Sequence, residues 1–82
     1  MIRVKGIIVP SNWDAEGNIV AISIATHDEQ EYLIENRDEG AKLKTLLRQE
    51  VELSGVVIRS GPQKTIKVKK FAPKKRDYKP LP

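Results

Sequence analysis

The sequence predicts an all-β domain, a five-stranded Greek-key barrel with one short helix and a flexible basic C-terminal tail. Several short runs rich in Val and Ile alternate with polar or small residues at a period of two, the pattern of half-buried strands. Only one segment has helical spacing, and three of the strand-like runs precede it while two follow it. A chain of 82 residues is long enough for one small domain and too short for a large substrate cavity.

Three strands are expected before the helix, at residues 2–10, 18–26 and 32–34. The first is rich in β-branched residues and ends at a Pro-Ser-Asn turn. In the second, Val20, Ile22 and Ile24 alternate with small residues, so these three side chains are expected to face the core. A polar turn separates the second strand from the shorter third one.

The helix is expected near residues 38–49, because Leu43, Leu46 and Leu47 recur at i, i+3 and i+4 among charged residues. Asp38 is its candidate N-cap. Two further strands are expected at 51–59 and 64–71, joined by a Ser-Gly-Pro-Gln turn. The barrel domain should therefore span 1–72, and the Pro-rich, basic segment 73–82 should be an extended or disordered tail.

Gly6 and Gly55 each interrupt a strand-like run. A small sheet closes into a barrel only if its strands coil sharply, and glycine within a strand marks a bend, a bulge or a close backbone approach. We expect a change of face at each glycine, so that Val56 and Ile58 point inward after Gly55. A phosphate-binding loop is the alternative, but neither glycine belongs to a Gly-rich phosphate-binding pattern.

The order of three strands, a helix and two strands resembles the OB-fold, the oligonucleotide- or oligosaccharide-binding fold, over about residues 2–72. The resemblance rests on the order and lengths of the elements and identifies no specific family. It implies that the first strand neighbours the fourth, which would place Gly6 and Gly55 on adjacent strands, and that the third pairs with the fifth. It also implies a ligand face on the second and third strands, flanked by the loops after the first and fourth.

The composition argues against catalysis and metal binding. The chain has no Cys and one His, so disulfides and thiolate zinc sites are excluded, and we expect no cofactor and no metal. His27 lies beside Asp28 in a turn, and no serine has a nucleophile-elbow context, so we expect no catalytic residue and no enzyme. No apolar run approaches the ~20 residues of a membrane span. A cytoplasmic monomer without membrane contact is expected.

The charge of the chain is divided unevenly. Residues 1–58 carry six basic and ten acidic side chains, a net charge of −4, whereas residues 59–82 carry nine basic and one acidic, a net charge of +8. Such asymmetry indicates a polyanionic partner. We therefore expect a non-enzymatic binding module that contacts single-stranded or structured RNA or DNA, or a nucleoprotein assembly. The expected contact residues are Arg59, Lys64, Lys67, Lys69, Lys70, Lys74, Lys75 and Arg76.

Two of these lysines have a competing interpretation. If the third and fifth strands pair, outward Lys67 and Lys69 would face the outward carboxylates Glu31 and Glu35 and form ordinary cross-strand charge pairs. For these two side chains we favour that structural interpretation. Lysine on a strand edge also keeps the edge soluble.

The expected ligand face suits a protein partner better than a nucleic acid. Its second strand would present a strip of small and apolar side chains, and the nearest aromatic residue, Trp13, is followed by acidic residues. The alternative function is therefore a protein-interaction or assembly domain that uses Trp13, Ile19 and Ala21. A single Trp in so small a barrel is more commonly a core plug or a lid, and a partner anchor is the second interpretation.

Overall fold

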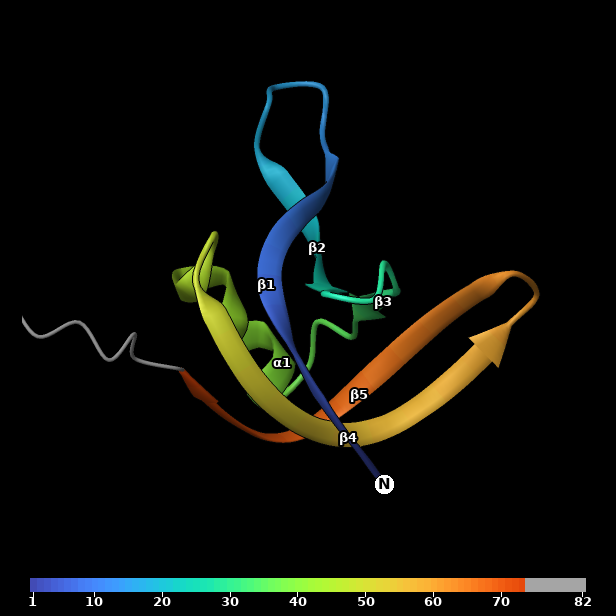
Figure 1. Ribbon diagram of the computed structural model, residues 1–82. Coiled ribbons are helices and arrows are strands. Elements are labelled where there is room, and N and C mark those ends of the chain that lie inside the picture. Colours follow the sequence, from blue (N-terminus) through green and yellow to red (C-terminus); the bar gives the residue numbers. More distant parts are fainter. Residues whose placement is uncertain (74–82) are drawn as a thin grey trace, which may run out of the picture.

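The computed structural model describes residues 1–73, which form a closed all-β barrel of five strands with one short helical segment (Figure 1). The elements are β1 (Ile2–Trp13), β2 (Ile19–Thr26), β3 (Glu31–Ile34), α1 (Glu39–Lys42) with its 3-10 continuation η1 (Leu43–Leu46), β4 (Glu50–Ser60) and β5 (Gln63–Pro73). The predicted all-β class, a five-stranded barrel with one short helix, is confirmed, and the architecture is consistent with an OB-like fold. The predicted flexible tail, apart from Pro73, which ends β5, lies outside the described residues. In this part of the chain no helix has the length and apolar character needed to cross a bilayer.

The strands close in the spatial order β1-β2-β3-β5-β4. Both predicted non-sequential pairings are present: β1 pairs antiparallel with β4, and β3 pairs parallel with β5. The ladder between β3 and β5 has only two residue pairs, Leu33 with Thr65 and Ile34 with Ile66. The barrel is therefore closed by a short ladder, whereas the β1–β2 and β4–β5 hairpins are long.

The core takes apolar side chains from every strand and from η1. Its buried members are Val4, Ile8, Ile22, Ile24, Ile34, Leu43, Val51, Leu53, Ile66 and Val68. Leu43 is completely buried, so η1 is held to the barrel by an apolar side chain rather than by its intrinsic helical stability. The helical segment is shorter than the predicted 38–49. Leu43 and Leu46 lie in the 3-10 turn, and the segment ends before Leu47, whose φ of −53° and ψ of 136° are not helical.

Asp38 occupies the N-cap position of α1, but its side chain makes no capping hydrogen bond. Its backbone has φ 51° and ψ −123°, a conformation that L-residues with a side chain rarely adopt. The predicted position of the cap is therefore confirmed, and the predicted side-chain interaction is not present.

Gly6 and Gly55 lie on neighbouring strands as expected, but the predicted change of face is wrong. Val57 packs against the core, whereas Val56 and Ile58 are 43% and 48% exposed. The core-facing residues are even-numbered on both sides of Gly6 and odd-numbered on both sides of Gly55, so neither strand changes its face at the glycine. The two glycines therefore have another function. Each lets a neighbouring backbone approach more closely than a side chain would allow.

β1 continues past Pro10 to Trp13, beyond its predicted end at the Pro-Ser-Asn turn. The pairing of β1 with β2 is irregular there, with register shifts on either side of Asn12. Val20 falls in the second irregularity and is 44% exposed, so its predicted place in the core is wrong. An extra, unpaired residue in a strand interrupts the alternation of inward and outward side chains. The alternation of apolar residues therefore gave a wrong prediction at this end of β2.

Candidate nucleic-acid interface

The β4–β5 hairpin extends away from the barrel (Figure 1). β1 pairs with β4 only as far as Gly55, so within residues 1–73 the last part of β4 pairs with β5 alone. The hairpin turns at Gly61, whose φ of 64° favours glycine, and at Pro62. This projecting arm, residues 56–67, carries three of the basic residues that the sequence singled out.

The arm has two faces of different character. Val57 lies opposite Ile66 and packs against the core, so the next pair on the same face, Arg59 opposite Lys64, also lies on the inner side of the arm. The outer face carries the exposed side chains of Val56 and Ile58, which lie opposite Lys67 and Thr65.

The inner face of the arm borders a cleft of about 470 Å³, which we call the basic cleft. Its lining residues are Ile2, Tyr32, Val57, Arg59 and Lys64. A second cleft of about 320 Å³ shares Ile2 and Tyr32 with it and continues past Arg3, Lys5, His27 and Asp28. The two clefts together join β1, β3, β4, β5 and the turn after β2.

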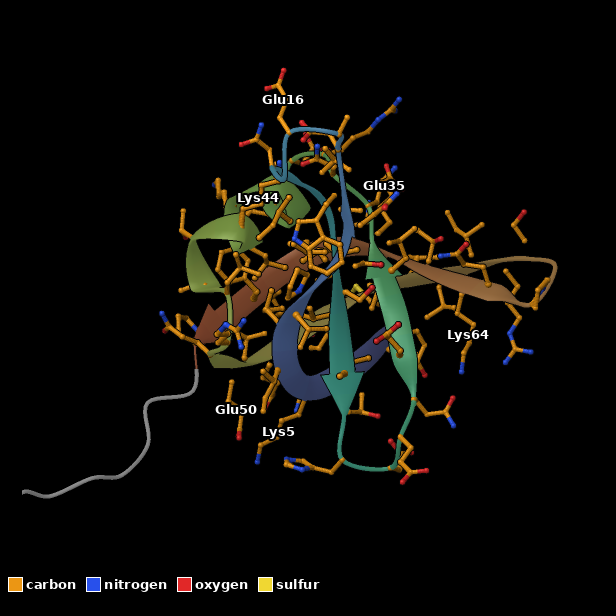
Figure 2. All side chains as sticks on the ribbon, turned by 90° about the horizontal axis from the view of Figure 1, so that it is seen from above. Lys5, Glu16, Glu35, Lys44, Glu50 and Lys64 are labelled. Atoms are coloured by element: carbon orange, nitrogen blue, oxygen red, sulfur yellow. The ribbon has the colours of Figure 1, made fainter. Side chains whose placement is uncertain are left out.

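Lys64 is held in place within the basic cleft. Its Nζ lies 4.8 Å from the centroid of the Tyr32 ring and donates a hydrogen bond to Oε1 of Gln30. In Figure 2, Lys64 extends from the β4–β5 hairpin beside β3. A cation over an aromatic face is attracted by the electrons of the ring, so Tyr32 positions the ammonium group without neutralising it.

All the ion pairs within residues 1–73 are formed by residues that precede Arg59. They are Arg3–Glu52 at 3.4 Å, Lys5–Glu50 at 3.9 Å, Arg37–Glu35 at 3.9 Å and Lys42–Glu39 at 2.9 Å. Figure 2 shows Lys5 and Glu50 on the same side of the barrel. In this described part of the chain, the five basic residues from Arg59 to Lys70 have no carboxylate within ion-pair distance. The favoured interpretation of Lys67 and Lys69 as partners of Glu31 and Glu35 is therefore wrong.

The structure distributes the predicted contact residues over several places rather than one. Arg59 and Lys64 line the basic cleft, and Lys67 lies on the outer face of the arm. Lys69 falls at the register shift next to Ser54, and Lys70 lines a separate cleft of about 280 Å³ with Arg3 and Phe71. The remaining predicted residues, Lys74, Lys75 and Arg76, lie outside the described residues.

Sequence reasoning missed Tyr32 and the N-terminal end of β1. Tyr32 packs against the core and also lines both clefts. The alternation of Ile2 and Val4 with Arg3 and Lys5 was the available signal, because it places two cations on the outer face of a strand beside β4.

A carboxylate lies near the basic cleft. Thr26 donates its hydroxyl hydrogen to Asp28, and this bond, helped by a backbone N–H and by the charge of Lys64, holds the pKa of Asp28 below its ordinary 3.8. Asp28 is therefore negative at neutral pH and attracts Lys64. Within residues 1–73, no three His, Asp or Glu side chains gather in an arrangement that would hold a metal ion.

The predicted partner face lies at the other hairpin. Trp13 is 52% exposed, so the interpretation of Trp13 as a core plug or lid is wrong. Ile19 lies opposite Trp13 and packs partly against the core, and Ala21 lies opposite Asn12 and is half-buried. The expected exposed strip on β2 is not continuous, because Ser23 is only 2% exposed.

Comparison of the chain with protein families, with curated proteins and with solved structures finds no match. The function is therefore argued from the arrangement of its own side chains.

Proposed function

We propose that the protein is a non-enzymatic module that binds single-stranded nucleic acid through the β4–β5 hairpin and the basic segment that follows it. The observation that carries the proposal is the set of five cations between Arg59 and Lys70 that have no carboxylate partner within residues 1–73. The OB-like architecture supports it, because such barrels commonly bind oligonucleotides. The +8 charge of residues 59–82 supports it further.

Unpaired lysines and arginines are suited to phosphate binding for a thermodynamic reason. A cation that already has a carboxylate partner must give up that interaction, whereas an unpaired one exchanges only water and mobile ions. Each phosphate that it neutralises releases condensed counterions from the nucleic acid, and this release makes affinity fall steeply with salt. Binding of this kind is largely independent of base sequence.

The first test is a fluorescence titration of the full chain with a labelled oligo-dT of twelve nucleotides at ~50 mM and ~200 mM salt. Five phosphate contacts on a single strand give a slope of about −3.5 in log affinity against log salt, so affinity should fall roughly a hundredfold over this interval. Absence of binding at the lower salt concentration would refute the proposal.

Two charge-matched double variants locate the interaction. K69Q/K70Q neutralises two unpaired cations of β5, whereas K42Q/K44Q neutralises two cations of the helical segment, of which Lys42 pairs with Glu39. The first variant should bind more weakly and with a flatter salt slope, and the second should bind like the wild type. Equal losses would mean that net charge alone determines binding. Neutralising Lys74, Lys75 and Arg76 together tests the tail in the same way.

A second candidate function is supported by the exposure of Trp13. An exposed Trp next to the apolar Ile19 is the kind of side chain that anchors a protein partner. In this case the chain would form a complex, with itself or another protein, that persists at high salt, because apolar contacts are little screened. Sedimentation of the wild type and of W13A at high salt tests this: a complex formed by the wild type and lost in W13A supports it.

A further inference from the structure

Arg59 and Lys64 lie directly opposite each other on neighbouring strands of the arm. Opposite side chains of an antiparallel pair have their Cβ atoms close together, and like charges in this position destabilise the pair. Within residues 1–73 neither side chain forms an ion pair with a carboxylate. The arrangement therefore has an electrostatic cost that an anion bound between the two groups would remove.

The pair is also partly preorganised. The Tyr32 ring and the Gln30 side chain hold Lys64 in the cleft, so its ammonium group needs little reordering to meet a ligand. Arg59 is exposed and offers the planar fork of N–H donors that matches a phosphate group. Lys64 supplies a fixed point charge, and Arg59 supplies directed hydrogen bonds.

The walls next to the two cations are apolar and aromatic. Ile2, which is 41% exposed, and Val57 line the cleft together with the ring of Tyr32. A volume of about 470 Å³ falls within the range of small-molecule sites and is sufficient for a single nucleotide unit. Two cations and an apolar surface in one cleft match a phosphate and the sugar and base attached to it.

Building on the proposed function, we propose that Arg59 and Lys64 clamp one backbone phosphate of a bound single strand, with the adjoining nucleotide against Ile2, Tyr32 and Val57. Tyr32 and Gln30 are positioning residues that hold Lys64. The ligand chemistry is a phosphate ester, and a terminal phosphate is a second source of the same group. The clamp is a local site within a broader electrostatic interaction that includes the other basic residues.

The clamp is tested with R59Q/K64Q and with K69Q/K70Q, which remove equal charge from the cleft and from outside it. Both are titrated with unlabelled dT8 at ~50 mM salt, and backbone amide shifts are followed by NMR. R59Q/K64Q should lose at least tenfold in affinity, together with the shifts at Ile2, Tyr32 and Val57. K69Q/K70Q should lose less and keep those shifts. R59Q/K64Q relieves a repulsion and also loses the contacts of Lys64 with Tyr32 and Gln30, so its thermal midpoint should stay close to that of the wild type. The midpoint therefore separates lost binding from lost folding.

Two further ligands and one residue complete the test. A dT8 with neutral methylphosphonate linkages should no longer shift the cleft amides, whereas adding a 5′-phosphate to ordinary dT8 should not change the affinity. If only the phosphorylated oligonucleotide shifts the cleft, the clamp holds a chain end and the backbone assignment is wrong. Y32F should bind like the wild type and Y32L several-fold more weakly, since only the ring is needed to position Lys64.

The two proposals fail in different ways. If dT8 binds with the expected salt dependence but both double variants lose equally, or the cleft amides do not shift, the clamp is wrong and nucleic-acid binding stands. If dT8 does not bind at ~50 mM salt, both are wrong.

Discussion

The backbone carbonyl of Ala25 lies against the Cα of Gly6, where a Cβ would be 2.8 Å from the carbonyl carbon. Gly55 has the same relationship with the carbonyl of Lys67, at 2.9 Å. Because the obstructing atoms are backbone, β2 or β5 would have to move to accept a methyl group. At these two points the backbones of β1 and β2, and of β4 and β5, lie so close together that only glycine fits.

We expect Gly6→Ala and Gly55→Ala each to lower the free energy of unfolding by about 3 kcal/mol, at the upper end of overpacking effects. Urea denaturation followed by circular dichroism measures the change. Gly17→Ala is the matched control: Gly17 has φ 86° but no atom near its missing Cβ, so its cost should be only about 1 kcal/mol. Equal costs at Gly6 and Gly17 would show that close approach is not what excludes a side chain.

Asp38→Gly should stabilise the protein by up to about 1 kcal/mol, because glycine adopts the positive φ of this position without strain. The substitution loses no capping bond, since the Asp38 side chain makes none. Asp38→Ala keeps the strained backbone and should have little effect on the urea midpoint. A clear loss of stability in Asp38→Ala would reveal an unrecognised contribution of the carboxylate.

Asp14 should make the β1–β2 loop sensitive to acid. Its Oδ1 accepts hydrogen bonds from the backbone N–H groups of Asn18 and Glu16, both at 2.9 Å, and these bonds, that of Asn18 above all, lower the pKa of Asp14 from its ordinary 3.8. A carboxyl group with a lowered pKa in the folded state stabilises that state above its ordinary pKa. This contribution is lost as pH falls through the lowered value.

The measurement compares wild type with Asp14→Asn between neutral pH and the acid range, using the fluorescence of the neighbouring Trp13. The stability difference should be constant at neutral pH and should shrink below pH 3.8. Glu16→Gln removes the same charge from the same loop and should leave the wild-type acid dependence in place. A difference that does not change with pH would contradict the role given to the Asp14 hydrogen bonds.

Asp28→Asn should strengthen binding of an oligonucleotide about two- to threefold at low salt, since it removes a negative charge beside the basic cleft. The gain should disappear at high salt. Glu16→Gln, at the far tip of the β1–β2 loop in Figure 2, removes the same charge away from the cleft and should have a smaller effect. If both variants strengthen binding equally, the effect comes from net charge and not from the position of Asp28.

Trp13→Ala should change the free energy of unfolding by no more than about 1 kcal/mol, because the side chain is 52% exposed. Leu43→Ala, at a completely buried position, should cost about 2–5 kcal/mol and serves as the reference for a core side chain. Circular dichroism is the suitable probe, since the variant has no other Trp. If Trp13→Ala lowered the free energy of unfolding as much as Leu43→Ala, Trp13 would have to be counted as a core residue.

The order of the elements could be predicted from the sequence because each strand has its own local pattern. The pattern could not predict which side chains face the core where neighbouring residues are alike. Val56, Val57 and Ile58 are all β-branched, so they show no alternation of apolar and polar residues. The proposed contact residues Arg59 and Lys64 could be selected from the distribution of charge along the sequence. The cleft between them did not, because it joins four strands and depends on the length of the arm, which tertiary pairing sets.

The short ladder between β3 and β5 also determines how the barrel opens. Leu33 and Thr65 are far apart in the sequence, so we expect their pairing to form after the β4–β5 hairpin is in place and to separate first in local unfolding. Separation frees an edge of β5 that carries Lys64 and Lys67, and charged edges resist pairing with strands of other molecules. We therefore expect the lysines of β5 to protect the opened barrel from aggregation, independently of any ligand.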